Sequence, residues 1–230
     1  EQPGWSGRFD GCRAGEPGLR LAEAEGGGLL PSGTYVSART IDLGSIYTSR
    51  VTPVLSVYGQ DVDDTMSKWP VLSALDGIVG ADASKWNAVM EMRTTDDDPD
   101  DAGALWSDWR EAATGDVAAR AYQMRLILSS VDDNITPIVA RAELTVDMPD
   151  RILSGNNLAV PSGGRRIGFD PPYFGLTGLS VSAQGLRFGD YYEIANKDES
   201  GFDIVFKDQS GAPVERTFDY VAAGYGKVHA

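Results

Sequence analysis

Apolar and polar residues alternate along several stretches of the chain. The cleanest alternation covers residues 138–148, where apolar side chains share one face and mostly charged or polar side chains share the other. A period of two predicts a β-strand with one buried and one wet face. Shorter alternations at residues 86–93 and 122–128 predict two more strands, and β-branched and aromatic runs at residues 34–44 and 51–59 predict another two.

Irregular stretches separate these predicted strands. Residues 1–33 are rich in glycine and contain three prolines, so we expect short strands joined by turns there and no helix. Residues 60–85 mix acidic clusters with a short apolar run, which predicts a long surface excursion with room for one helical turn. Residues 94–103 combine Pro99 with five aspartates, a composition that predicts a loop.

The pattern changes after residue 148. Turn-forming residues dominate residues 148–164 and the periodicity disappears, so we place a domain boundary there. Five short strand signals with turn residues between them follow, at residues 167–169, 179–183, 191–196, 202–206 and 217–222. Such spacing is typical of a β-sandwich. The chain is therefore predicted to be all-β, with antiparallel β-sandwich domains at residues 1–150 and 160–230.

Composition and charge narrow the range of functions. A hydrophobic content of 42% suffices for one large or two small cores. No apolar run is long enough to predict membrane insertion. A net charge of -14 argues against a nucleic-acid partner, because that affinity comes largely from lysine and arginine. The chain starts at Glu1 without a leader pattern, so it is either processed or, as we favour, the end of a longer protein.

Residues for covalent catalysis or metal binding are scarce. Cys12 is the single cysteine, which excludes an internal disulfide, and no Cys/His cluster suggests zinc. His229, the single histidine, lies at the C-terminal end, where a rigid catalytic base is not expected. We therefore predict no enzymatic activity, no cofactor and no metal, although a glycosidase, which needs only two carboxylates, stays open.

Two groups of residues have both a functional and a structural interpretation. Aspartates within residues 96–101 could ligate Ca²⁺, but the spacing of a calcium loop is absent, so a solvated loop is favoured. Trp106 and Trp109 could form a platform for a sugar ring. Their spacing of three does not place both on one strand face, so core packing is favoured. Trp69 and Trp86 flank the predicted excursion and are expected to anchor it.

Several motifs, taken in order, resemble one group of proteins. DDDPDDAGALWSDWREAATGDVAARAYQMRLILSS at residues 96–130 is followed by TPIVARAELTVDMPDR at residues 136–151 and by a last segment at residues 168–226. Over residues 30–226 this order resembles the C-terminal region of tail-tip and central tail-fibre proteins of long-tailed bacteriophages. The last segment also resembles the H-type lectin domain, through Phe169 with Tyr173 or Phe174, GFDIVF at residues 201–206 and the stretch from Tyr220 to Gly224.

The resemblance carries expectations about fold and function. It implies a galactose-binding-like jelly roll followed by a small six-stranded lectin-like sandwich, assembled as a homotrimer. The protein would lie at the distal end of the virion tail, after synthesis in the host cytoplasm. Its partners would be other tail proteins and a host cell-surface glycan or protein receptor. H-type lectins hold their sugar with a histidine and a tryptophan near the last strand, and the last segment of this chain has neither.

Five residues are candidates for ligand or subunit contact. Adjacent tyrosines on a strand point to opposite faces, so one of Tyr191 and Tyr192 is expected to be buried and the other exposed, next to Asp190. Asp219 and Tyr220 occupy the region where H-type lectins bind sugar, although a closing strand or a trimer contact would explain them equally well. The alternative functions are a monomeric carbohydrate-binding module of a secreted bacterial protein and a purely structural tail spacer.

Overall fold

The computed structural model describes residues 4–62 and 81–227, and the chain divides into two units. Unit 1 comprises Glu1–Ser45, Val51–Gly115 and Ala119–Val146, and unit 2 comprises Ile46–Arg50, Asp116–Ala118 and Asp147–Ala230. Every regular element among the described residues is a β-strand, so the predicted all-β class is confirmed. The described part of the chain has no helix with the length and apolar character to cross a membrane.

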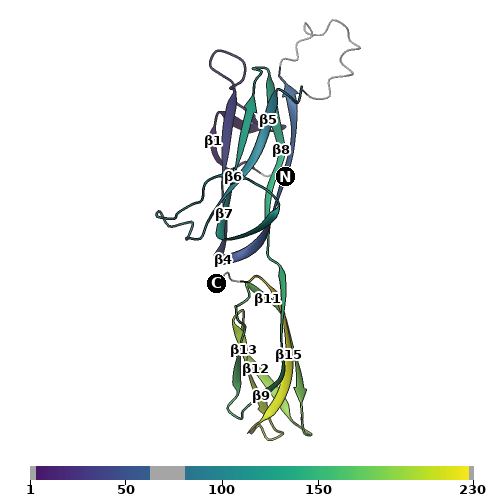
Figure 1. Cartoon of the computed structure of the whole chain (residues 1–230). Coiled ribbons are helices and arrows are strands. Elements are labelled where there is room, and N and C mark those ends of the chain that lie inside the picture. The colour runs from purple at the N-terminus through teal and green to yellow at the C-terminus, as the bar shows by residue number, and fades with distance from the viewer. Residues whose placement is uncertain (1–3, 63–80, 228–230) are drawn as a thin grey trace, which may run out of the picture. The chain divides into compact units, whose positions relative to one another are not determined.

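Unit 1 is built on one eight-stranded sheet in the order β2-β3-β8-β4-β7-β5-β6, with β1 paired to β4. Its strands, shown in Figure 1, are β1 (Gly7–Asp10), β2 (Cys12–Gly15), β3 (Gly18–Leu21), β4 (Ser32–Asp61), β5 (Trp86–Thr95), β6 (Arg110–Glu111), β7 (Gly115–Ser130) and β8 (Ile135–Asp147). The strands predicted from the alternating stretches are therefore confirmed. The two predicted at residues 34–44 and 51–59 are parts of the single strand β4.

The core of unit 1 explains the alternation in its sequence. Side chains from β2, β3, β4, β5, β7 and β8 meet in one buried cluster, which includes Leu19, Tyr35, Met90, Leu126 and Val139. Strands from both halves of the sheet contribute to this cluster, so the sheet must curve around it. On β5 and β7 the alternate positions Glu91, Arg93, Gln123 and Arg125 are only partly buried, and they lie on the opposite face from Met90 and Leu126.

Unit 2 contains two small sheets. One has the order β10-β13-β12 with β14 paired to β13, and the other has the order β11-β15-β9. The strands are β9 (Asp150–Val160), β10 (Arg165–Gly168), β11 (Gly175–Gln184), β12 (Tyr191–Asp198), β13 (Gly201–Lys207), β14 (Pro213–Val214) and β15 (Arg216–Tyr225). The five strands predicted in this region are confirmed. No strand was predicted at residues 148–164, but β9 fills most of this stretch and pairs with β15 over most of its length.

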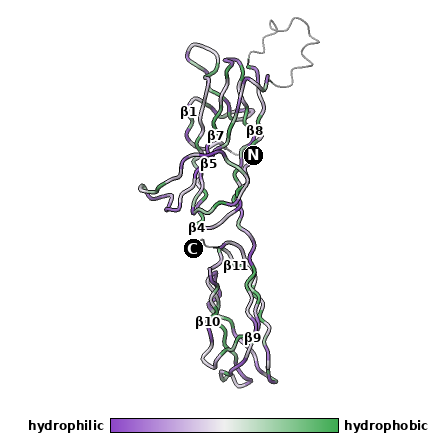
Figure 2. Tube along the Cα trace, viewed as in Figure 1, coloured by the Kyte–Doolittle hydropathy of each residue, from purple (hydrophilic) through white to green (hydrophobic). Residues whose placement is uncertain are grey.

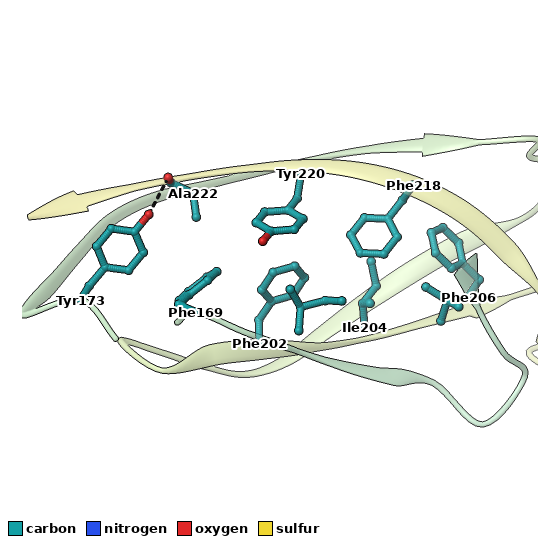
Figure 3. Close-up of a cluster of buried hydrophobic side chains, with 10 residues drawn as sticks. Phe169, Tyr173, Phe202, Ile204, Phe206, Phe218, Tyr220 and Ala222 are labelled. Atoms are coloured by element: carbon teal, nitrogen blue, oxygen red, sulfur yellow. Dashed lines mark hydrogen bonds between the residues drawn. The ribbon is translucent and has the colours of Figure 1, made fainter. Parts of the chain in front are cut away.

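Aromatic side chains fill the space between the two sheets of unit 2. Figure 3 shows Phe218 and Tyr220 of β15 facing Phe202, Ile204 and Phe206 of β13. The hydroxyl of Tyr173 donates a hydrogen bond to the carbonyl of Ala222 at 2.8 Å, which satisfies its one polar group inside the core. This packing of two sheets face to face is the architecture of a small sandwich. The finer jelly-roll and lectin-like expectations stay predictions.

The loops account for the remaining sequence features. Most of the predicted excursion at residues 60–85, including Trp69, lies outside the described residues, as does His229. Trp86 begins β5, and its indole Nε1–H donates to the carbonyl of Ala81 at 3.4 Å, which fits its expected role as an anchor. The loop predicted at residues 94–103 is present between β5 and β6, and hydrophilic residues dominate it (Figure 2).

Candidate functional site

Asp190 is a buried ion-pair partner at the start of β12. Its carboxylate lies 2.5 Å from the guanidinium of Arg216 at the start of β15, with side-chain exposures of only 3% and 14%. The carboxylate also accepts a hydrogen bond from the backbone N–H of Arg187 at 2.8 Å. The Arg187 N–H, followed by the contact with Arg216, holds the pKa of Asp190 below its usual value. Asp190 therefore fastens β12 to β15 and is not itself available to a ligand.

Tyr191 and Tyr192 both lie at the surface. Their exposures are 41% and 38%, so the prediction that one of them is buried is wrong. The Tyr192 ring rests against Phe206 with a centroid distance of 5.8 Å. The physical reason is the position of the strand: β12 is the last strand of its sheet, and no residue of β12 belongs to the core of unit 2. Alternation places the two rings on opposite faces, but neither face is covered.

Asp219 and Tyr220 have different roles on β15. Asp219 accepts hydrogen bonds from the Asn157 backbone N–H at 2.7 Å and from the Gln184 side chain at 2.7 Å, which links β15 to both neighbouring strands. Tyr220 packs against Phe169, Phe202 and Phe218. It is only 9% exposed, and this burial raises the pKa of its hydroxyl. Tyr220 is therefore a core residue rather than a surface contact.

A pocket of about 450 Å³ lies between the ends of β9, β11 and β15 in unit 2. Its polar lining comes from Gln184, Glu215, Arg216 and Thr217, and Val160 and Pro161 add apolar surface. Asp190 and Asp219 do not line it, but each holds one lining side chain through the contacts described above. Two of the predicted residues, Asp190 and Asp219, therefore position pocket side chains and do not line the pocket themselves.

Exposed side chains surround the start of β12. Every residue of β12 is exposed, and Phe188 in the preceding loop is 95% exposed. We call this region the β12 surface, and its large apolar side chains are Leu186, Phe188, Tyr191, Tyr192 and Ile194. Among the described residues, β12 pairs in its sheet with β13 alone, so backbone N–H and C=O groups along its other edge have no partner strand. Exposed apolar residues beside a free strand edge are typical of a protein contact.

The chain shows no match to known family models, to curated proteins or to solved structures. A functional assignment therefore depends on the geometry of the β12 surface and on the chemistry of the clefts.

Trp106 and Trp109 do not enter the core, and the prediction of core packing is wrong. Both rings are partly buried and stack on the Arg93 guanidinium, whose Cζ lies 4.6 Å and 4.7 Å from their centroids. The reason is that Arg93 lies on the outer face of β5, where a cation attracts the faces of aromatic rings. The second ring also stacks on Arg125, at 4.7 Å. This cluster was missed because the residues are distant in sequence, and only the paired strands β5 and β7 bring them together.

The acidic loop uses its carboxylates for local hydrogen bonds. Asp98 and Asp101 accept hydrogen bonds from backbone N–H groups two residues later, and Asp97 accepts one from the Leu105 N–H at 2.8 Å. Asp98 also pairs with Arg120 at 2.8 Å. Within the described ranges, no group of three or more His, Cys, Asp or Glu residues could hold a metal ion. The geometry of these aspartates is that of a hydrogen-bonded loop, the interpretation favoured from the sequence.

Proposed function

We propose that the chain is a structural and receptor-binding component of a bacteriophage tail tip or tail fibre, and that it assembles as a homotrimer. In this role it contacts other tail proteins at the distal end of the virion and mediates attachment to the host cell surface. The observation that carries the proposal is the β12 surface, an edge strand with both faces uncovered. The order of the sequence motifs that resemble tail proteins supports the viral context.

The β12 surface suits a second copy of the chain for physical reasons. Unit 2 is a small sandwich, and small domains bury a smaller fraction of their surface than large ones do. Packing of side chains around β12 in three copies would cover the apolar surface of Tyr192 and Ile194, which share one face of the strand. Burial of each such side chain contributes about 1.5–3 kcal/mol before the costs of association. Three copies meeting at β12 would therefore gain the burial that one copy lacks.

The pocket next to Arg216 is the proposed place for a surface ligand on unit 2. Its volume of about 450 Å³ lies within the range typical of small-molecule sites. The Asp190 carboxylate fixes the Arg216 side chain, which is the arrangement that favours a specific polar contact. The same ion pair fixes the start of β12 relative to β15. It therefore positions both the pocket and the strand of the proposed subunit contact.

Light scattering on the purified chain tests the assembly. We expect a mass three times the chain mass of 24.6 kDa. Ile194→Asp should reduce the mass to that of one chain, because it buries a charge in the proposed contact. The matched control is Leu105→Asp in unit 1, an equally drastic change at a residue that is 80% exposed. A wild-type mass of one chain would contradict the trimer and favour the monomeric carbohydrate-binding module.

A second measurement separates attachment from a purely structural role. The trimeric chain is labelled and applied to a glycan array and to whole bacterial cells. Binding that is lost in Glu215→Gln, an exposed pocket residue outside the Asp190–Arg216 ion pair, with the mass unchanged, supports a receptor site at the pocket. A trimer that binds neither glycans nor cells favours the tail spacer.

A further inference from the structure

The stacked arginines of unit 1 lie in a second cleft, which the proposed function does not use. It has a volume of about 670 Å³. Its side-chain lining includes Arg8 of β1, Arg93 of β5, Trp109, and Gln123 and Arg125 of β7. Thr34 of β4 adds a hydroxyl group to the lining, whereas the hydroxyl of the buried Ser37 accepts a hydrogen bond from the Arg39 N–H at 3.0 Å. In a chain with a net charge of -14, a cleft with three guanidinium groups is a marked local reversal of charge.

The guanidinium groups of this cleft are held rigidly. The Oε1 of Gln123 accepts two hydrogen bonds from Arg93, at 2.9 Å from Nε and 2.6 Å from Nη2. The amide of Gln123 in turn donates to the Ser37 carbonyl at 3.1 Å. With the two tryptophan rings stacked on it, the Arg93 side chain is fixed from both its edge and its face. A preorganised cation of this kind loses little conformational freedom when an anion binds.

Negative charge in the cleft does not balance the positive charge. Arg125 pairs with Glu91 at 2.6 Å. Among the described residues, neither Arg8 nor Arg93 has an acidic partner. Burial, followed by the charge of Arg125, lowers the pKa of Arg93. Such a shift means that the protonated form is less well solvated there than in water, and an anion in the cleft would compensate for that.

We propose that this cleft of unit 1 binds an acidic saccharide, with the carboxylate of the sugar paired to Arg93 and Arg8. A planar carboxylate matches the two-pronged geometry of a guanidinium. The hydroxyl groups of the sugar ring meet Thr34, whose hydroxyl is a neutral donor and acceptor. The size of the cleft accommodates one or two sugar rings. The inference concerns unit 1 alone and does not rest on the proposed assembly through unit 2.

Nuclear magnetic resonance of the full chain tests the site, with sodium glucuronate as the probe. We expect the indole N–H signal of Trp109 to shift with a dissociation constant on the order of 1 mM, the strength typical of a ligand of this size. Glucose at the same ionic strength is the neutral control and should leave the signal in place. Equal shifts with glucose and glucuronate, or no shift with glucuronate, would overturn the proposal. Tighter binding of glucose 6-phosphate than of glucuronate would overturn the assignment to a carboxylate.

Variants separate a binding role from a purely structural one. Arg8→Gln removes an exposed charge without a partner in the described structure, so the fold should be unaffected, and binding should weaken roughly threefold or more. Arg93→Lys keeps the charge but loses the paired N–H donors of the guanidinium, and binding should weaken roughly tenfold. Arg141→Gln, at an exposed position of unit 1 outside the cleft, makes the same charge change as Arg8→Gln and should leave binding unchanged. Equal binding by Arg8→Gln and Arg141→Gln would refute the site.

Discussion

Replacing Phe202 with alanine should strongly destabilise unit 2. The ring is fully buried and lies 5.6–6.3 Å, between centroids, from three other aromatic rings of the sandwich core. Truncation of a buried phenylalanine costs about 3–5 kcal/mol, through lost burial and the cavity that remains. A typical domain has only about 5–15 kcal/mol of stability. For a domain of this size, 1 kcal/mol corresponds to about 4–8 °C, so the unfolding temperature of unit 2 should fall by at least about 12 °C.

Calorimetry and fluorescence together measure this effect. Calorimetry follows both units, whereas tryptophan fluorescence follows unit 1, since all five tryptophans lie in its residue ranges. The control is Phe188→Ala, which removes the same atoms from an exposed ring and should change stability by less than about 0.5 kcal/mol. Both variants are compared at a concentration at which light scattering finds single chains, because assembly would add stability. Equal shifts in the two variants would refute the assignment of the core.

Three further predictions concern single residues. The Arg187 N–H lowers the folded pKa of Asp190, so its contribution to stability is present above the unfolded pKa of about 3.9 and is lost as pH falls through the folded value. Asp190→Asn should therefore be least stable relative to wild type near pH 6, and the difference in melting temperature should shrink towards pH 3. Burial raises the pKa of the Cys12 thiol, so alkylation at pH 8 should be slower in the folded chain than in urea. Gly201 has a φ of 151° and its missing β-carbon would collide with the Ile167 carbonyl, so Gly201→Ala should cost at least about 1 kcal/mol in urea unfolding.

The fold was predictable where one face of a strand is buried. β5 and β7 show clean alternation because their inner residues enter the core of unit 1. β8 differs, because residues 135–139 are buried on both faces, including Val139, which the pattern placed on the wet face. β9 escaped prediction because it is rich in serine, asparagine and glycine, and because its pairing with β15 is a long-range interaction. The local sequence pattern does not predict which distant strand a segment pairs with.

The candidate sites were predictable only in part. The motif around Tyr191 and Tyr192 marked the right strand, but alternation alone cannot tell how far the opposite sheet extends. Both rings are exposed because β12 lies outside the core, a property of the whole sandwich. The cluster of Arg93 with two tryptophans depends on pairing between β5 and β7 and on the loop that returns to cover it. One feature of the sequence could have indicated this cluster. An arginine lies at an outward position of a predicted strand, and the loop that follows contains two tryptophans.

The edge of β12 is protected along part of its length, and this supports a finite assembly. Pairing with β13 becomes irregular after Ala195, where Asn196 adopts a φ of 48° and Lys197 follows. Irregular pairing and lysine are common means by which sheets prevent uncontrolled edge pairing. The first half of β12 has no such protection, and it is there that Tyr191, Tyr192 and Ile194 are exposed. A short open segment next to a blocked one limits edge pairing to one place, which restricts the growth of the sheet from chain to chain.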